Sequence, residues 1–281
     1  MPQTINTNLA SLNAQRNLNA SQSSLSTSMQ RLSSGLRVNS AKDDAAGLAI
    51  AERMNAQVRG MNVAIRNAND GISLAQTAEG ALSKVGDALQ RMRELAVQSR
   101  NATNSSSDKD SLNKEFMELQ KEITRVLGGT TFNGKHILGT DATTLTFQIG
   151  ANVTTDDIIQ IDTVNMATDA DITAVTSGAA IDGAASASAI GTVISDIDTA
   201  LNLINDTRAT FGATQSRFDA IVSNLQQSVE NQAAARSRIM DADYASETAN
   251  MSRAQILQQA GTAMVAQANS LPQQVLKLLQ G

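Results

Sequence analysis

A seven-residue repeat constrains the fold of this chain more than any other feature. Its first row consists of Met54, Met61, Ala68, Ala75, Leu82, Leu89 and Ala96. A repeat of seven held over this length is typical of a helix whose seam faces other helices, with left-handed supercoiling. We therefore predict one long helix over residues 44–100.

A second row of sevens runs through the last third of the chain. Its members are Ile190, Ile197, Ile204, Phe211, Phe218, Leu225, Gln232 and Ile239. At 1.5 Å per residue this helix would be about 75 Å long. Because such a helix cannot lie inside a small globule, we predict that it packs along residues 44–100 in an elongated antiparallel helical bundle.

Both ends of the chain carry narrower apolar rows with the same spacing. These rows are Leu18, Leu25 and Leu32 near one end, and Leu257, Met264, Leu271 and Leu278 near the other. A helix with a narrow apolar stripe and no local partner is only marginally stable in water. We therefore expect the two terminal helices to meet each other, and also to meet neighbouring molecules.

The middle of the chain has a different pattern. Residues 130–185 are rich in Thr, Asp, Gly and β-branched residues, and Asn133-Gly134 is a hairpin turn signal. Apolar residues alternate at Leu145, Phe147 and Ile149, and again at Ile159 and Ile161. We predict a small β-hairpin region here, followed by a loop over TSGAAIDGAASASAIG. The preceding run SSSDKD offers N-cap candidates for a short helix that ends at the glycine pair 128–129.

Composition excludes several classes of function. The chain has 281 residues with no Cys and one His, so thiolate catalysis and a two-His metal site within one chain are excluded. A net charge of −5 argues against a nucleic-acid binder with a large basic face. No run reaches the 18 to 20 apolar residues of a membrane-spanning helix, and the N-terminus does not resemble a secretory signal. Aromatic residues make up only 2%, which is low for a compact enzyme.

Several residues could be interpreted as chemical sites. Asp43-Asp44 and the pair Asp241 and Asp243 suggest carboxylate dyads, but helix caps explain both better. We interpret His136 as an exposed loop histidine, and the glycines within residues 44–100 as sites of close packing or kinks. Two classes of function remain, a structural protein that polymerises through its terminal helices and a helical secretion or adaptor protein. An enzyme ranks third.

Longer stretches of the sequence resemble one family. INTNLASLNAQRNLNASQ, RLSSGLRVNSAKDDAAGLAIAERM and LQRMRELAVQS near the front, with SRIMDADYASETANMSRAQILQQAGTAMVAQANSLPQQVLKLL at the back, are similar to bacterial flagellin. The resemblance covers about residues 3–135 and 190–280. The alternative is a hook–filament junction (hook-associated) protein, which shares the terminal helices.

The resemblance implies a mainly α fold and a structural role without enzymatic activity, cofactor, nucleic acid or membrane partner. The terminal helices, about residues 1–40 and 242–281, would pair as a coiled coil lining the filament core. Residues 41–241 would form a helical bundle with a β region at about 130–185. The chain resembles a short flagellin without large outer variable domains, exported by the flagellar type III apparatus to the extracellular filament.

The resemblance also implies partners. These are other copies of the chain in a helical homopolymer, an export chaperone on the C-terminal helix, and the filament cap and hook-associated proteins. A toll-like innate receptor of hosts recognises the family along QRMRELAVQ and SLNKEF. The matching receptor-contact positions here are Arg91, Leu95 and Glu115.

Overall fold

The computed structural model describes the backbone of residues 7–279 and the side chains of residues 7–270. The described chain is mainly α, as the sequence predicts. Its helices are α1 (Leu9–Ser34), α2 (Ala45–Ser99), α3 (Ser106–Gly129), α4 (Ala170–Thr176), α5 (Ala187–Met240) and α6 (Tyr244–Leu279). Its strands are β1 (Thr131–Phe132), β2 (Lys135–His136), β3 (Thr144–Gln148) and β4 (Ile158–Asp162). Two short 3-10 turns, Thr155–Asp157 and Met166–Thr168, flank β4.

The chain divides into two compact units. One unit combines Met1–Ala56 with Glu230–Gly281, and the other is Gln57–Val229. The division falls inside α2 and α5, whereas the sequence places its domain boundaries at the helix breaks near residues 40 and 241. Those domain boundaries remain a prediction.

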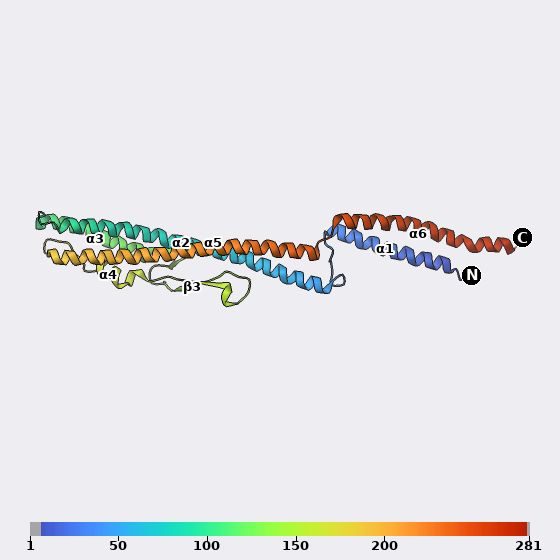
Figure 1. The fold of residues 1–281 in the computed structure, drawn as a ribbon, viewed down its shortest axis with the longest axis horizontal. Helices are drawn as coiled ribbons and strands as arrows, with labels where there is room; N and C mark the ends of the chain where they lie inside the picture. Colours follow the sequence, from blue (N-terminus) through green and yellow to red (C-terminus); the bar gives the residue numbers. More distant parts are fainter. Residues whose placement is uncertain (1–6, 280–281) are drawn as a thin grey trace. The chain divides into compact units, whose positions relative to one another are not determined.

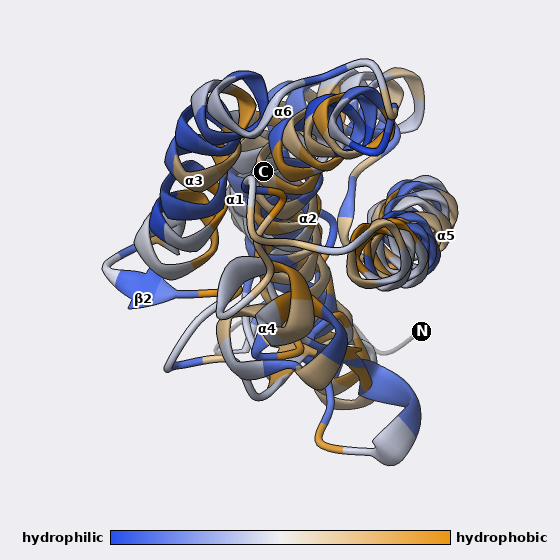
Figure 2. Ribbon diagram, turned by 90° about the vertical axis from the view of Figure 1, so that its left-hand side faces the viewer, coloured by the Kyte–Doolittle hydropathy of each residue, from blue (hydrophilic) through white to orange (hydrophobic). Residues whose placement is uncertain are grey.

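The central unit is built around the seam between α2 and α5. The two rows of sevens supply this seam, and their members from Ala68 to Ala96 and from Ile190 to Phe218 are at most 1% exposed. Figure 2 shows apolar residues along the faces of these helices that meet. The repeat therefore predicts both long helices and their buried faces correctly. Phe218 fits against Gly71, where an added Cβ would lie 2.7 Å from the Phe218 Cζ atom.

Helix α3 begins at a capping box and covers one side of this seam. The Ser105 side chain accepts from the Asp108 amide at 3.3 Å, and the Asp108 carboxylate accepts from the Ser105 amide at 3.0 Å. Its apolar face buries Phe116, Ile123 and Leu127, each at most 1% exposed. Figure 2 shows the opposite face of α3 to be hydrophilic. The predicted helix start and end are confirmed.

Two small hairpins follow α3. Strands β1 and β2 pair around the predicted turn, where Asn133 and Gly134 both have positive φ (49° and 79°). Strands β3 and β4 pair in antiparallel register, with Phe147 opposite Ile159. The ring of Phe147 lies edge-on to Phe218 at a centroid distance of 5.7 Å, which fixes the second hairpin to the helical core.

The low-complexity segment after α4 is a loop that is held through its backbone. Asn113 of α3 accepts from the Ile181 amide at 3.0 Å, and Ser99 of α2 donates to the Ile181 carbonyl at 2.6 Å. Gln120 of α3 donates to the carbonyls of Val175 and Ala179. Ile181 is fully buried. The predicted loop ends earlier than expected, because α5 already begins at residue 187.

The terminal unit holds α1, α6 and the segments that join them to the long helices. Figure 1 shows α1 and α6 side by side. Leu36 and Asp241 form an isolated β-bridge, and the Arg37 guanidinium donates to the Ile239 carbonyl at 2.7 Å. Val38 and Met240 are buried beside this bridge. The two connections are therefore tied together by backbone bonds and by a small apolar cluster.

Candidate functional site

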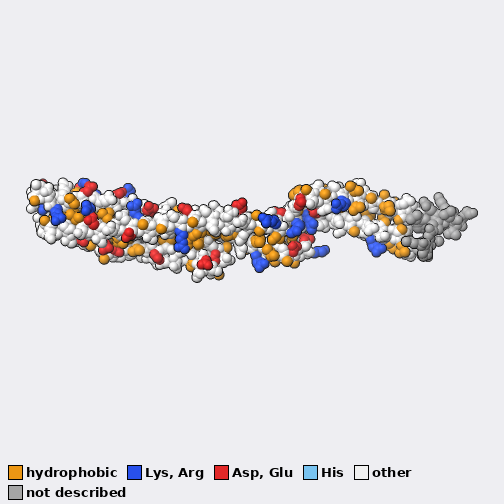
Figure 3. Space-filling model, in the orientation of Figure 1, with side chains coloured by type: hydrophobic (Ala, Val, Ile, Leu, Met, Phe, Trp, Pro, Cys, Tyr) orange, Lys and Arg blue, Asp and Glu red, His pale blue; other side chains and the backbone are white. Residues whose placement is uncertain are grey.

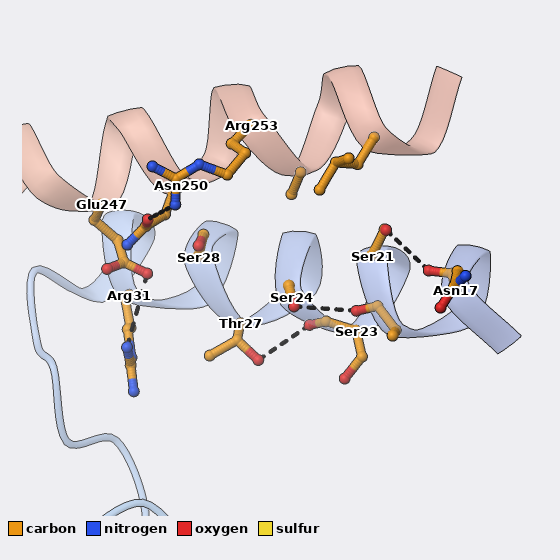
Figure 4. Close-up of a pocket in the computed structure, with 13 residues that line it drawn as sticks. Asn17, Ser21, Ser23, Ser24, Thr27, Ser28, Arg31, Glu247, Asn250 and Arg253 are labelled. Atoms are coloured by element: carbon orange, nitrogen blue, oxygen red, sulfur yellow. Dashed lines mark hydrogen bonds and ion pairs between the residues drawn. The ribbon is translucent and has the colours of Figure 1, made fainter. Parts of the chain in front are cut away.

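The pairing of α1 with α6 rests on a seam in which small residues recur every seven positions, at Ala254, Gly261 and Ala268. Figure 4 shows part of this pair, with Ser28 of α1 and Glu247 of α6 on the sides that face each other. Buried or half-buried positions on α6 recur as Glu247, Met251, Ala254, Gln258, Gly261, Val265 and Ala268. Gly261 receives Leu18, whose Cδ1 lies 3.2 Å from an added Cβ. Small side chains let two helix backbones approach closely, and a seven-residue spacing keeps the seam facing the partner. The predicted pairing of the terminal helices is present within one chain.

Polar contacts fix the antiparallel register of this pair. At one end Asn8 donates to the Ala268 carbonyl at 2.7 Å, and Ser11 donates to Asn269 at 2.7 Å. At the other end the Tyr244 hydroxyl donates to the Leu32 carbonyl at 2.9 Å. Because the contacts lie at both ends, a slip of one helix along the other would break all of them.

The predicted terminal rows are used in two different ways. Leu18, Leu25 and Leu32 are half-buried in the seam between α1 and α6. Leu257 and Met264 lie beside that seam and stay 50% and 62% exposed. The side chains of Leu271 and Leu278, which continue the same row, lie outside the described residues. The described part of the C-terminal row, Leu257 and Met264, therefore lies outside the seam between α1 and α6.

Large apolar side chains gather on the outer surface of this pair. Besides Leu257 and Met264, those that are at least 47% exposed are Leu9, Leu12, Met29, Tyr244 and Ile256. Figure 3 shows many hydrophobic and few charged side chains over the face of this pair that it presents. Exposed apolar patches of this kind are typical of surfaces that associate with another protein.

A second candidate surface lies where α2 meets α3. Arg91 of α2 donates to Glu115 of α3 at 2.8 Å and to Glu94 at 2.9 Å. The hydrogen bond to Glu115 raises the pKa of Arg91, and the bond to Asp198 raises the pKa of Arg93 in the same way. About half of the Arg91 and Glu115 side-chain surfaces remains exposed, so both are available to a partner.

Leu95, the third predicted receptor-contact residue, lies inside the central unit. Its side chain is 0% exposed and belongs to the core of the central unit. The physical reason is helical spacing, because Leu95 lies three residues after Met92 and four before Ser99, both fully buried on the same side of α2. Leu95 is therefore not on the surface of the folded unit, and its contact with a receptor remains a prediction. The apolar side chains that are exposed nearby are Val97 (50%) and Met117 (45%).

The aspartate pairs are caps, as the sequence predicts. Asp43 accepts from the backbone amides of Ser40 and Asn39, and the Ser40 amide contributes most to lowering the pKa of Asp43. Asp44 accepts from the Gly47 amide at 2.7 Å at the start of α2.

The second pair lies at the break between α5 and α6. Asp241 accepts from the Ser237 hydroxyl at 2.6 Å. Asp243 accepts from the Ala245 amide and from Ser246, whose hydroxyl contributes most to lowering the pKa of Asp243. These hydrogen bonds hold the carboxylates to their own helix ends, so neither pair is arranged as a dyad.

His136 is half-buried at the end of β2, not an exposed loop residue. Its backbone amide donates to Asp141 at 2.9 Å, and its Nδ1 atom is buried without a hydrogen-bond partner. Across the described side chains, no group of three or more His, Asp or Glu residues could hold a metal ion. Within the same part of the chain, no helix is both long and apolar enough to cross a membrane.

Comparison with known proteins identifies the family. A family model described as the bacterial flagellin N-terminal helical region matches residues 5–143, and one described as the C-terminal helical region matches residues 194–279. A flagellin of Halalkalibacterium halodurans is 45% identical over 276 residues, which cover 98% of this chain and 99% of that protein. The chain belongs to the bacterial flagellin family.

Other flagellins match along their whole length. The flagellin of Xenorhabdus nematophila is 44% identical over 317 residues and is covered completely, as is this chain. The crystal structure of Bacillus cereus flagellin is 32% identical to this chain, covers 61% of it and 94% of itself, and has a TM-score of 0.49. Membership in the flagellin family makes the chain a structural subunit of the flagellar filament, not an enzyme, and places it in the extracellular filament. No observation favours the hook-associated alternative.

Proposed function

We propose that the chain polymerises into the filament through the paired terminal helices, about residues 1–40 and 242–281. The observation that carries this proposal is the apolar outer surface of α1 and α6. Leu257 and Met264 are half or more exposed although each is large and apolar. Burying a side chain of this size contributes about 1.5–3 kcal/mol, and the gain recurs in every subunit of a polymer.

The central unit does not depend on this surface for its own core. Its two long rows are already buried against each other within one chain. Residues 41–241 would therefore form a bundle that stays folded while the terminal pair makes the contacts between subunits. Between α3 and α5 the described chain holds only two hairpins, two short 3-10 turns and α4, which fits a flagellin without a separate outer domain.

Truncation tests this division. Removal of residues 1–40, of residues 242–281, or of both should leave the helical circular dichroism signal of the central bundle and abolish sedimentable filaments. Loss of either helix also exposes the seam of the other, so the variant that lacks both is the cleaner one. Filaments formed by the variant without both segments would contradict the proposal.

Export and assembly require further partners. In this family the subunit is exported by the flagellar type III apparatus. A chaperone binds the C-terminal helix until export, and cap and hook-associated proteins bind at the filament ends. The exposed row on α6 supports the chaperone, because an uncovered apolar row would self-associate before export. A chaperone bound to α6 should therefore protect Met264 from oxidation in the monomer.

The α2/α3 surface is proposed to contact a toll-like host receptor through Arg91 and Glu115. An arginine at the centre of such an interface contributes about 2 kcal/mol or more, or roughly thirtyfold in affinity. Arg91→Ala should weaken receptor signalling by monomer to this extent. Arg125→Ala is the matched control, since Arg125 of α3 is also exposed and also paired with a neighbouring carboxylate, Glu122. Equal signalling by the two variants would contradict this assignment.

A further inference from the structure

One asparagine of the chain is followed by glycine, and it lies at the tip of the hairpin between β1 and β2. Asn133 and Gly134 are both exposed, and an added Cβ at Gly134 would meet nothing within 4 Å. Figure 2 shows β2 at the outer edge of the central unit. Asn133 has a φ of 49°, and no other non-glycine residue of the described chain has a positive φ. Water therefore reaches both residues of this step freely.

An asparagine side chain can react with the backbone amide of the residue that follows it. Here the Gly134 nitrogen would lose its proton to hydroxide and attack Cγ of Asn133, so that a C–N bond forms, the Cγ–Nδ2 bond breaks and ammonia leaves. Water then opens the resulting succinimide ring and gives aspartate or isoaspartate. Glycine has no Cβ to hinder the attack, and asparagine is one of the thermolabile residues of proteins.

Two asparagines outside the helices precede serine, and hydrogen bonds hold both of them away from this reaction. The Asn104 side chain donates to the Gln98 carbonyl at 2.6 Å, which restrains the leaving group. The Ser105 amide, which would have to attack, donates instead to the Asp108 carboxylate at 3.0 Å.

The other step has the same two restraints. The Asn39 side chain donates to the Leu36 carbonyl at 3.1 Å, and the Ser40 amide donates to the Asp43 carboxylate at 2.9 Å. At each asparagine–serine step the carboxamide and the attacking nitrogen must therefore both be released before the ring can close.

The step from Asn133 to Gly134 has neither restraint. Neither the Asn133 side chain nor the Gly134 amide makes a hydrogen bond to a described residue. Ring closure requires the Gly134 nitrogen to turn toward Cγ, so the tip of the hairpin must open. Strands β1 and β2 have two residues each, and so short a hairpin opens locally at low cost.

We propose that Asn133 is a site of spontaneous deamidation and isoaspartate formation in the folded chain. The inference goes beyond filament assembly and does not depend on it. Aspartate adds one negative charge beside Lys135 and keeps the turn, since Asp tolerates a positive φ as Asn does. Isoaspartate carries the backbone through the former side chain and lengthens it by one methylene. The pairing of Phe132 with Lys135 should therefore be lost in the isoaspartate form.

Peptide mapping after incubation in mildly alkaline buffer tests the site. Trypsin cleaves after Arg125 and Lys135, and Asn133 is the only side-chain amide of the peptide 126–135. Mass spectrometry with fragment ions gives the rate of conversion at Asn133 and, in the peptide 101–109, at Asn104. The ratio of the two rates is measured in the folded chain and in guanidinium chloride, where only the preference for the following residue remains.

The ratio of the Asn133 rate to the Asn104 rate should be at least about tenfold larger in the folded chain, since two side-chain hydrogen bonds must break at the Asn104 step alone. Asp108→Ala frees the Ser105 amide, so it should raise the Asn104 rate and leave the Asn133 rate unchanged. An unchanged Asn104 rate in that variant would overturn the role given to the hydrogen bonds. Equal ratios in the folded and unfolded chains, or conversion of Asn104 before Asn133 in the folded chain, would overturn the proposal.

Discussion

Replacing Gly71 by alanine should destabilise the central unit, although alanine is the better helix former. The new Cβ would lie 2.7 Å from Cζ and 2.9 Å from Cε2 of the Phe218 ring. Carbon atoms in contact prefer about 3.5–4.0 Å, so the ring must move by about 1 Å. Phe218 is fully buried and lies edge-on to Phe147, so it has no free space to move into.

The magnitude follows from two opposing effects. An overpacked core costs about 1–3 kcal/mol, whereas replacement of a mid-helix glycine by alanine gains up to about 1 kcal/mol. The net loss for Gly71→Ala should therefore be about 0.5–2 kcal/mol. Gly80→Ala in the same helix has nothing within 4 Å of its new Cβ and should stabilise by about 0.5–1 kcal/mol.

Urea unfolding of the monomer, followed by circular dichroism, measures both variants. The free energies of unfolding should change in opposite directions and differ by about 1–3 kcal/mol. Gly71→Ala combined with Phe218→Leu should lose less than the sum of the two single changes, since the clash is with that ring. A Gly71→Ala variant as stable as Gly80→Ala would refute the account of how α2 and α5 pack.

Two further predictions concern the cap of α3 and the core of α2. The pKa of Asp108 is lowered, chiefly because its carboxylate accepts a hydrogen bond from the Ser105 hydroxyl. The stabilisation of the folded state by the ionised carboxylate is therefore complete above the pKa of the unfolded chain and is lost as pH falls below about 4. The difference in melting temperature between wild type and Asp108→Asn should shrink between about pH 5 and pH 2, and a constant difference would contradict the cap. Leu95→Ala should cost about 2–5 kcal/mol in urea unfolding because its side chain is fully buried, whereas Val97→Ala, at a 50% exposed position, should cost well under 1 kcal/mol.

The spacing of residues predicted the long helices well, because that information is local and repeated. Each seam residue from Ala68 to Ala96 supports the same helix and the same face, so no single exception alters the result. The Asn133-Gly134 turn and the start of α3 near Ser105 were also predictable. Both depend on residue types that satisfy nearby backbone geometry.

Partners that lie far apart in sequence could not be predicted in the same way. Leu257 and Met264 form a row of large apolar residues on α6, yet Ala254, Gly261 and Ala268, with the same spacing, face α1 instead. Hydrophobicity alone favours the larger residues, whereas the close approach of two helices requires the smaller ones. Which row faces the partner depends on the shape of both helices together.

Residue roles at the surface were the hardest to predict. Arg91 and Glu115 are 24 positions apart and meet only because α3 folds back on α2. Leu95 belongs to the same motif but lies inside, since one motif on a helix contributes to both the core and the surface. Gln120 holds a low-complexity loop through backbone carbonyls, and no sequence signal of the loop itself indicates that contact.

The central claim is that the exposed row on α6 becomes buried between subunits, and Met264 tests it most directly. Met264→Asp should leave monomer unfolding unchanged, because the side chain is 62% exposed there. Its critical concentration for assembly should rise at least tenfold, since every subunit would bury a carboxylate in place of a thioether. Ala266→Asp, two residues away and also exposed, adds the same charge outside the row. A clear rise for Met264→Asp over Ala266→Asp is the predicted result, and equal critical concentrations would contradict the assignment of this row to the contact between subunits.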